Sequence, residues 1–308
     1  MAVEQDTATG FVDFYNRLRD FLTTDATLVG LSQEWAQIAG NVGTLTIDDE
    51  ITLQGPGLSA SDEVRVNIVP VYSVVNNRYN LQMRGTPNWN PLVAQNVQFN
   101  MSSAVYVHLW DSSMPYTIVA NGRRFIFVCQ VSTTVQAGYG GFILPYALPT
   151  EYPYPLAVGG TSSTSTWDYT TTDLRHGHFV TPSNGALRLY GPGNTWIDFS
   201  NYTISSGIYQ WTVPGSVVLP VGYNSSWVGD LTTLRECFGG DYPLHPYILI
   251  SSTPTVARLG VLEGCYRMPG IGTSHGSLLD VDSPGDHLVV QNVNRTDNLL
   301  GFWALRLE

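Results

Sequence analysis

The segment that most restricts the fold is residues 116–131, YTIVANGRRFIFVCQV, in which Asn121-Gly122 joins two apolar runs. Both residues of an Asn-Gly pair readily adopt the positive φ angles of a type I′ turn, whose twist matches two paired antiparallel strands. The segment therefore predicts a β-hairpin with a type I′ turn. Because both runs are nearly continuous in apolar residues, we expect both faces of the sheet to be covered there.

The remaining sequence favours strands and contains one amphipathic helix. From Gly43 onward, apolar and polar residues alternate with a period of two, interrupted by turns such as Gly55-Pro56-Gly57. The 30 glycines and 18 prolines in 308 residues supply such turns, because aromatic and β-branched residues stay abundant. Residues 9–25, TGFVDFYNRLRDFLTTD, instead place apolar residues at helical spacing, with Thr9 as the expected N-cap.

These patterns predict a mainly β protein with two β-sandwich-like halves and an N-terminal amphipathic helix. The Gly/Ser/Thr-rich run GGTSSTSTWDYTTTD favours a boundary near residue 160. The expected organisation is a helix and connection over residues 1–42, a first β domain over 43–160 and a second over 161–308.

The charge of the chain argues against nucleic acid as a direct partner. The formal net charge is −11, and all fourteen basic residues are arginines, with no lysine. Binding to a phosphate backbone is driven by a basic surface, which this composition does not supply. The N-terminus MAVEQDTATG lacks the basic and apolar regions of a signal peptide, and no apolar run reaches transmembrane length. We therefore expect synthesis in a cytoplasm and no membrane partner.

No reactive centre or cofactor site is predicted. Cys129, Cys237 and Cys265 lack the spacing of a zinc site or a disulfide framework. Gly272-Thr273-Ser274-His275-Gly276 matches the G-x-S-x-G pattern of a nucleophile elbow, but no helical segment follows it, as that elbow requires. We therefore expect no enzymatic activity, with an esterase-like reading as a distant alternative.

A metal site would have to be built from few histidines. His176 and His178, in LRHGHFV, would lie on one face of a strand, and His245 would join them only if the fold brought it close. Two histidines without a third ligand make a weak site. A loop pair without metal is therefore the favoured interpretation, and no metal or cofactor is expected.

Two apolar segments are candidates for contacts with another subunit. The helical stripe either packs on the β core of its own chain or docks on a neighbour. The segment GGFILPYALPTEYPYPLAVGG alternates prolines with tyrosines, which makes it extended and stiff. It either packs on its own domain or lies over a neighbouring subunit. The candidate interface residues are Phe11, Phe14, Tyr146, Tyr152 and Tyr154.

The segment PYTIVANGRRFIFVCQVSTTVQAGYGGFILPYALPTEYPYPLAVGG, residues 115–160, resembles a family of virion structural proteins of tailed bacteriophages. So do the ending GVLEGCYRMPGIGTSHGSLLDVDSPGDHLVVQNVNRTDNLLGFWALRLE and the early helix followed by FLTTDATLV. The resemblance covers a third to a half of the chain.

The resemblance implies a non-enzymatic component of the particle, in the neck, collar, tail or baseplate. Its implied partners are copies of itself and other virion proteins, and its implied location is the virion, after synthesis in the host cytoplasm. Symmetric contacts between several copies are expected for such a component. The alternative is a carbohydrate- or receptor-binding module of the tail or baseplate, because eight tryptophans and seventeen tyrosines are also suited to stacking on sugars.

Overall fold

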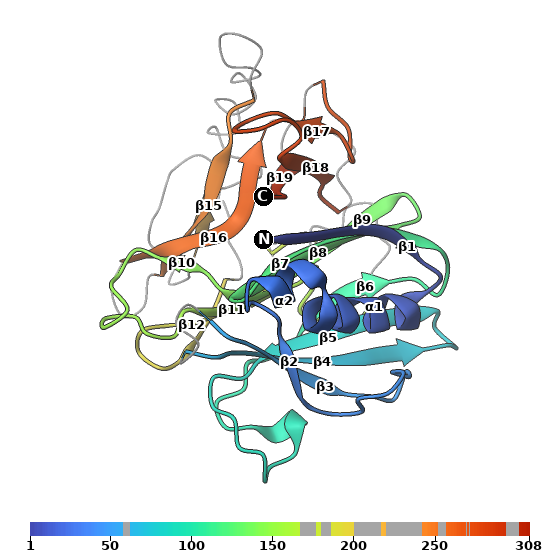
Figure 1. Ribbon diagram of the computed structural model, residues 1–308, viewed down its shortest axis with the longest axis vertical. Helices are drawn as coiled ribbons and strands as arrows, with labels where there is room; N and C mark the ends of the chain where they lie inside the picture. The colour runs from blue at the N-terminus through green and yellow to red at the C-terminus, as the bar shows by residue number, and fades with distance from the viewer. Residues whose placement is uncertain are drawn as a thin grey trace, which may run out of the picture.

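The structure, a computed structural model, contains three antiparallel sheets and one N-terminal helical segment (Figure 1). The described residues are 1–57, 62–166, 177–179, 186–199, 217–219, 242–251, 257–268, 270, 272–293 and 302–308. The mainly β fold with an N-terminal amphipathic helix, predicted from the sequence, is confirmed.

Sheet A lies in the middle of the molecule. Its strands, in spatial order, are β1 (Ala2–Ala8), β7 (Met114–Asn121), β8 (Arg124–Val131), β9 (Thr134–Phe142), β11 (Leu156–Gly159), β12 (Leu187–Tyr190) and β13 (Trp196–Asp198). The edge strand β1 is polar over most of its length, which explains why its sequence gives no strand pattern. Sheet A also contains strands from both sides of the boundary expected near residue 160, so the two halves share it.

Sheets B and C cover the two faces of sheet A. Sheet B consists of β2 (Ala36–Ala39), β3 (Ile51–Gly55), β4 (Val64–Ser73), β5 (Arg78–Gly85) and β6 (Val105–Leu109). Sheet C consists of β14 (Val217–Leu219), β15 (His245–Ser251), β16 (Ala257–Met268), β19 (Phe302–Arg306), β18 (His287–Gln291) and β17 (Leu278–Leu279), with β10 (Leu144–Pro145) added beside β16. The result is two sandwich-like units that share sheet A: one is formed by sheets A and B, and the other by sheets A and C.

Two hydrophobic cores fill these layers. Along β7 and β8, Ile118, Ala120, Phe125 and Phe127 are buried in the core between sheets A and B. The side chains that alternate with them belong to the core between sheets A and C; these are Val119, Ile126 and Val128. That core also contains Leu262 and Trp303 of sheet C. The prediction that both faces of this hairpin are covered is therefore confirmed.

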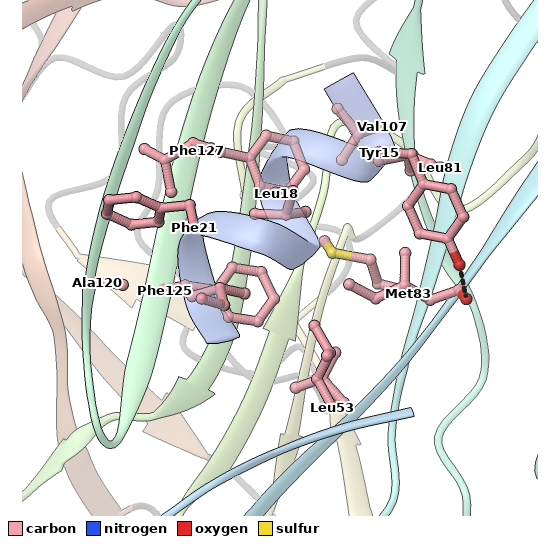
Figure 2. Packing of buried hydrophobic residues seen from close by; sticks show 14 of the residues in the cluster. Tyr15, Leu18, Phe21, Leu53, Leu81, Met83, Val107, Ala120, Phe125 and Phe127 are labelled. Carbon is pink, nitrogen blue, oxygen red and sulfur yellow. Dashed lines mark hydrogen bonds between the residues drawn. The ribbon is translucent and has the colours of Figure 1, made fainter. Parts of the chain in front are cut away.

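Helix α1 (Phe11–Thr24) lies inside the first core, and the short helix α2 (Ala26–Gly30) follows it. Figure 2 shows α1 between strands of sheet A and strands of sheet B, with Tyr15, Leu18 and Phe21 pointing into the packed side chains. The hydroxyl of Tyr15 donates to the carbonyl of Ile68 at 3.0 Å. Within the described part of the chain, neither helix is long and apolar enough to cross a bilayer.

The expected N-cap of α1 is wrong by one residue. Gly10 is the N-cap, and it offers no side chain to the first turn. Asp13 in the first turn instead fixes the chain before the helix, because its carboxylate accepts a hydrogen bond from the backbone N–H of Thr9 at 2.8 Å. An acidic residue in the first turn also interacts favourably with the helix dipole.

The hairpin between β7 and β8 is confirmed, but the expected type I′ turn is wrong. Asn121 pairs with Arg124, so Gly122 and Arg123 are the central residues, and neither has a positive φ angle. The Asn121 side chain instead accepts hydrogen bonds from the backbone N–H groups of Arg123 and Arg124, both at 3.0 Å. Asparagine favours the turn through this side-chain contact rather than through its backbone.

Gly122 is required by the close approach of another segment. A Cβ atom there would lie 2.8 Å from Cγ of Pro56 and 3.3 Å from Cα of Gln33. The carbonyl of Gly122 also accepts a hydrogen bond from the backbone N–H of Gly57 at 2.9 Å. A substitution at Gly122 would thus be costly through crowding and not through backbone strain.

Candidate interaction surface

The two helical candidates for an interface lie inside the chain's own core. Phe11 and Phe14 are both buried, and Phe14 contacts the rings of Tyr116 and Phe127 at centroid distances of 5.3 and 5.1 Å. Both phenylalanines therefore stabilise the fold of this chain and have no surface left to offer to a neighbour. The interpretation that the helix packs on its own β core fits these contacts.

The Pro/Tyr segment, residues 143–155, links sheets A and C, and we refer to it as the strap. It leaves β9 of sheet A, pairs with β16 of sheet C through β10, and returns to sheet A as β11. The backbone N–H of Tyr146 donates to the carbonyl of Leu259 at 3.0 Å, which extends the pairing with β16. The strap therefore joins layers of one chain.

Tyr152 and Tyr154 are inward anchors of the strap. Tyr152 is buried, and its hydroxyl donates to the carbonyl of Tyr190 in sheet A. Tyr154 packs against the first core, donates its hydroxyl to the carbonyl of Glu63, and contacts the Phe142 ring at 4.9 Å. Burial raises the pKa of both phenols far above the ordinary value. Tyr152 thus offers almost no surface to another subunit, and Tyr154 is only partly exposed.

The outward side of the strap is apolar. Leu144, Tyr146 and Leu148 alternate with inward residues, and 55% of Tyr146 and 65% of Leu148 are exposed. We call these three side chains the strap face. Of the five candidate interface residues, only Tyr146 belongs to it. Leu144 and Leu148 were missed because the prolines obscure the period of two.

A second exposed apolar surface lies on the long connection between β5 and β6. This apolar loop, residues 86–103, projects beyond sheet B at the bottom of Figure 1 and includes the short 3₁₀ helix η1 (Gln95–Val97). Leu92 is 92% exposed and Phe99 75% exposed, and Val97 is also largely exposed. We call these three side chains the loop tip. Sequence reasoning overlooked this loop.

The apolar loop is held in one conformation by a buried amide. The Nε2 atom of Gln98 lies 3.0, 2.7 and 3.2 Å from the carbonyl oxygens of Asn90, Val93 and Ala94. The Oε1 atom of Gln98 accepts a hydrogen bond from the backbone N–H of Asn90 at 2.8 Å. One side chain thus bonds backbone groups of three residues of the turn, a pattern typical of compact surface loops.

Contacts with sheets A and B anchor the base of the loop. The side chain of Gln95 accepts from the hydroxyl of Thr52 at 2.9 Å and donates to the carbonyl of Glu50 at 3.1 Å. The carbonyl of Asn100 accepts a hydrogen bond from the indole of Trp196 at 2.6 Å. The loop tip is therefore presented on a fixed support.

The apolar loop contains no charged residue. All eighteen positions from Thr86 to Ser103 are neutral, although 13% of the whole chain is charged. This absence, together with large apolar residues that follow no period, is the sequence signal that identifies the loop. Loops of this length inside a compact domain are usually functional.

The two arginines after the hairpin turn join sheets A and C. The guanidinium of Arg123 lies 2.5 Å from Oε1 of Glu263, and Nε of Arg124 lies 3.5 Å from Oε2 of the same carboxylate. Arg124 is buried and Glu263 nearly so. These ion pairs fix β8 against β16 and leave no basic patch at the turn.

His178 is a buried structural residue. Its Nε2 donates to the carbonyl of Val135 at 2.9 Å, and its Nδ1 accepts a hydrogen bond from the indole of Trp303 at 2.8 Å. Burial lowers the pKa of His178 to about 4. Both ring nitrogens are thus occupied, so His178 cannot serve as a metal ligand without breaking the contact between sheets A and C.

The other candidate catalytic and metal-binding residues do not form a site in the part of the chain that the structure describes. His176 and Cys237 lie outside the described residues, while Cys129 and Cys265 are buried free thiols. Ser274 sits in an exposed turn with its Oγ atom 3.2 Å from the hydroxyl of Ser277. The segment continues into β17 rather than into a helix, so the nucleophile elbow is not formed. Among the described residues, no group of three or more His, Cys, Asp or Glu could hold a metal ion.

No family model matches the chain, and no curated protein matches it significantly.

Proposed function

We propose that the protein is a non-enzymatic structural component of a tailed-phage particle, located in the neck, collar or tail. In this proposal it assembles with copies of itself and with other virion proteins. The resemblance of residues 115–160 and of the C-terminal segment to virion structural proteins supports the proposal.

The observation that carries the proposal is the apolar loop. Leu92, Val97 and Phe99 project from a rigid support, although the hydrophobic effect favours their removal from water. A preorganised apolar surface is suited to a protein interface, because little conformational entropy is lost when it docks. The absence of charge on the loop fits the centre of such an interface, where charged residues are depleted.

Quantitative mass spectrometry of purified particles tests the proposal. We expect the protein at a fixed copy number in particles of the phage that carries the gene. The double variant Leu92→Ser/Phe99→Ser should enter particles less efficiently, whereas Val75→Ser should enter normally. Val75 is a matched control because it is 96% exposed in the β4–β5 turn, away from the loop. Purified particles that lack the protein would contradict the proposal.

A second candidate is a carbohydrate- or receptor-binding module. It is favoured by the exposed Phe99 ring on a loop rich in amide side chains, since sugars stack on aromatic rings and form hydrogen bonds with amides. Binding of the purified protein to host surface glycans, lost in Phe99→Ala, would favour this function over a purely structural one.

A further inference from the structure

We infer that His178 is an acid-sensitive switch that releases sheet C from sheet A. Protonation of its imidazole ring opens the interface between these two sheets, while the unit formed by sheets A and B stays folded. The inference concerns a change of conformation and does not depend on the proposed function.

The ring of His178 connects the two sheets. Its Nε2 atom lies 2.9 Å from the carbonyl oxygen of Val135 in sheet A, and its Nδ1 atom lies 2.8 Å from the indole nitrogen of Trp303 in sheet C. An indole N–H can only donate, so Nδ1 is the acceptor and the ring carries its proton on Nε2, which donates to Val135. The contact therefore requires a neutral imidazole in this one tautomer.

A second proton on this ring has no acceptor. It would bind at Nδ1 and point at the indole N–H of Trp303, so that two donors would face each other. Burial disfavours the charged ring and holds the pKa of His178 at about 4, below its ordinary value of 6.5. The hydrogen bond from the indole stabilises the neutral ring and acts in the same direction.

The described groups around the ring offer no compensating negative charge. They are the Val135 carbonyl of β9, the Trp303 indole of β19, the Phe179 ring, the neutral amide of Asn292 after β18 and the imidazole of His275 before β17. Among these groups only the imidazole of His275 titrates. Its own pKa is also lowered by burial, and protonation of both rings would place two positive charges against each other.

Sheet C comes from a separate stretch of the chain. Apart from β10, its described strands lie within residues 217–306, whereas the described strands of sheets A and B lie within residues 2–198. Movement of sheet C therefore breaks no strand pairing inside sheets A and B, and Figure 1 shows it as a layer of its own at the top of the view. The strap is paired with β16 through β10, so it limits the distance over which sheet C can move.

The direction of the pH effect follows from the pKa of His178 in the two forms. Once the interface is open, the ring is in water and its pKa returns to about 6.5, so the open form binds more protons between pH 6.5 and 4. The open fraction therefore rises as the pH falls through this range, by up to about 300-fold, and levels off below pH 4. The core between sheets A and B is instead filled by apolar side chains of α1 such as Phe14 and Leu18, which do not titrate.

Two buried free thiols report separately on the two interfaces. Cys265 of β16 belongs to the core between sheets A and C, and Cys129 of β8 belongs to the core between sheets A and B. Each thiol is modified with an aromatic disulfide of the dithiodipyridine type, which still reacts in acid, and peptide mass spectrometry follows each site. Every rate is divided by the rate of the same cysteine in the urea-unfolded chain at the same pH.

Between pH 7 and 4 we expect the corrected rate at Cys265 to rise at least about 10-fold, and the rate at Cys129 to stay unchanged. Return to pH 7 should restore the protection of Cys265. Equal increases at the two cysteines would overturn the inference, because global unfolding exposes both cores. A constant rate at Cys265, or protection that does not return, would overturn it as well.

His178→Gln separates the charge of the ring from its contacts. A glutamine amide can donate to the carbonyl of Val135 and accept from the indole of Trp303, but it does not titrate. The corrected rate at Cys265 should therefore lose its pH dependence. His108→Gln alters a buried histidine of sheet B and is the control, which should leave the acid response of Cys265 unchanged. A full acid response in His178→Gln would overturn the inference.

Trp303→Phe gives an independent test that leaves His178 in place. The variant keeps an aromatic ring but removes the indole donor, so a proton at Nδ1 no longer meets another donor. The pKa of His178, measured by NMR titration of the ring, should rise from about 4 to at least about 5. The acid response of Cys265 should shrink accordingly. An unaltered pKa of His178 in folded Trp303→Phe would show that the indole does not oppose protonation, and the inference would then fail.

Discussion

The strap and the apolar loop both contain many apolar residues, but they direct these residues differently. The strap is rich in proline and tyrosine, yet two of its three tyrosines, Tyr152 and Tyr154, turn inward and bond backbone carbonyls of the same chain. The apolar loop has fewer aromatic residues, yet it presents Leu92, Val97 and Phe99 to solvent on a rigid support. The abundance of apolar residues in a segment therefore does not indicate an interface. The direction of each side chain does.

Replacing an inward tyrosine of the strap should give the largest effect. Tyr152→Ala removes a buried ring and leaves the carbonyl of Tyr190 without its side-chain partner, so we expect a loss of about 3–5 kcal/mol in the free energy of unfolding. Tyr146→Ala is the matched control, and it should change stability by less than about 0.5 kcal/mol because the ring is exposed. Urea denaturation followed by tryptophan fluorescence measures both. Equal losses would break the distinction between the two sides of the strap.

Acid should weaken the packing of sheet C, to which the strap is paired, against sheet A. It should weaken the packing of sheet B, from which the apolar loop projects, to a smaller extent. The pKa of His178 is about 4 in the folded chain and about 6.5 in the unfolded chain, so the unfolded chain binds more protons between these values. Stability therefore falls as the pH is lowered from about 6.5 to 4, by roughly 3 kcal/mol from this residue. Burial also lowers the pKa of His275, which contributes in the same direction.

Denaturation midpoints across this pH range check the prediction. His178→Gln keeps a polar side chain but cannot titrate, so its stability should depend less on pH than that of the unaltered protein. Hydrogen exchange, corrected for intrinsic rates, should show loss of protection in β16 and β19 before β4 and β5. A pH dependence unchanged by His178→Gln would exclude His178 as the cause.

The sequence predicted the local helix and hairpin well, but it did not predict which distant strands pair with each other. The hairpin around Asn121 and the helix from Phe11 follow from patterns that a few neighbouring residues determine. The pairing of β1 with β7, and of β12 with β11, joins segments far apart in the chain, which no local period encodes. The shared central sheet was therefore not predictable from the sequence.

The strap face and the loop tip could not be predicted from the sequence for a different physical reason. Along the strap, prolines prevent a regular strand, and a period of two would place Tyr146 and Tyr152 on the same face, although Tyr146 is exposed and Tyr152 is buried. In the apolar loop, exposure of Phe99 depends on Gln98 filling the interior of the turn. A single amide that takes the place of a hydrophobic core has no sequence signature of its own.

Removal of that amide should give an intermediate effect. Gln98→Ala leaves the carbonyl of Val93 and the backbone N–H of Asn90 without their partner, and we expect a loss of about 1–3 kcal/mol. Gln130→Ala, at an exposed position, is the control and should be nearly neutral. Hydrogen exchange should increase over residues 88–101 and not in the strap. Unchanged protection of the loop would mean that its conformation is fixed by the contacts at its base.

The smallest effect on stability is expected at the loop tip itself. Phe99 is 75% exposed, so Phe99→Ser removes little buried surface and should change the free energy of unfolding by no more than about 0.5 kcal/mol. The same substitution at Phe127, which is fully buried between α1 and sheet A, should cost at least about 3 kcal/mol. Thermal and urea unfolding of the two variants measure the contrast at dilute concentration, where copies do not meet. A large loss for Phe99→Ser under these conditions would show that the ring packs within its own chain, and the loop would then be a part of the fold like the strap. A near-zero change would leave the exposed ring without a structural role in the isolated chain, as expected for a side chain whose partner lies on another molecule.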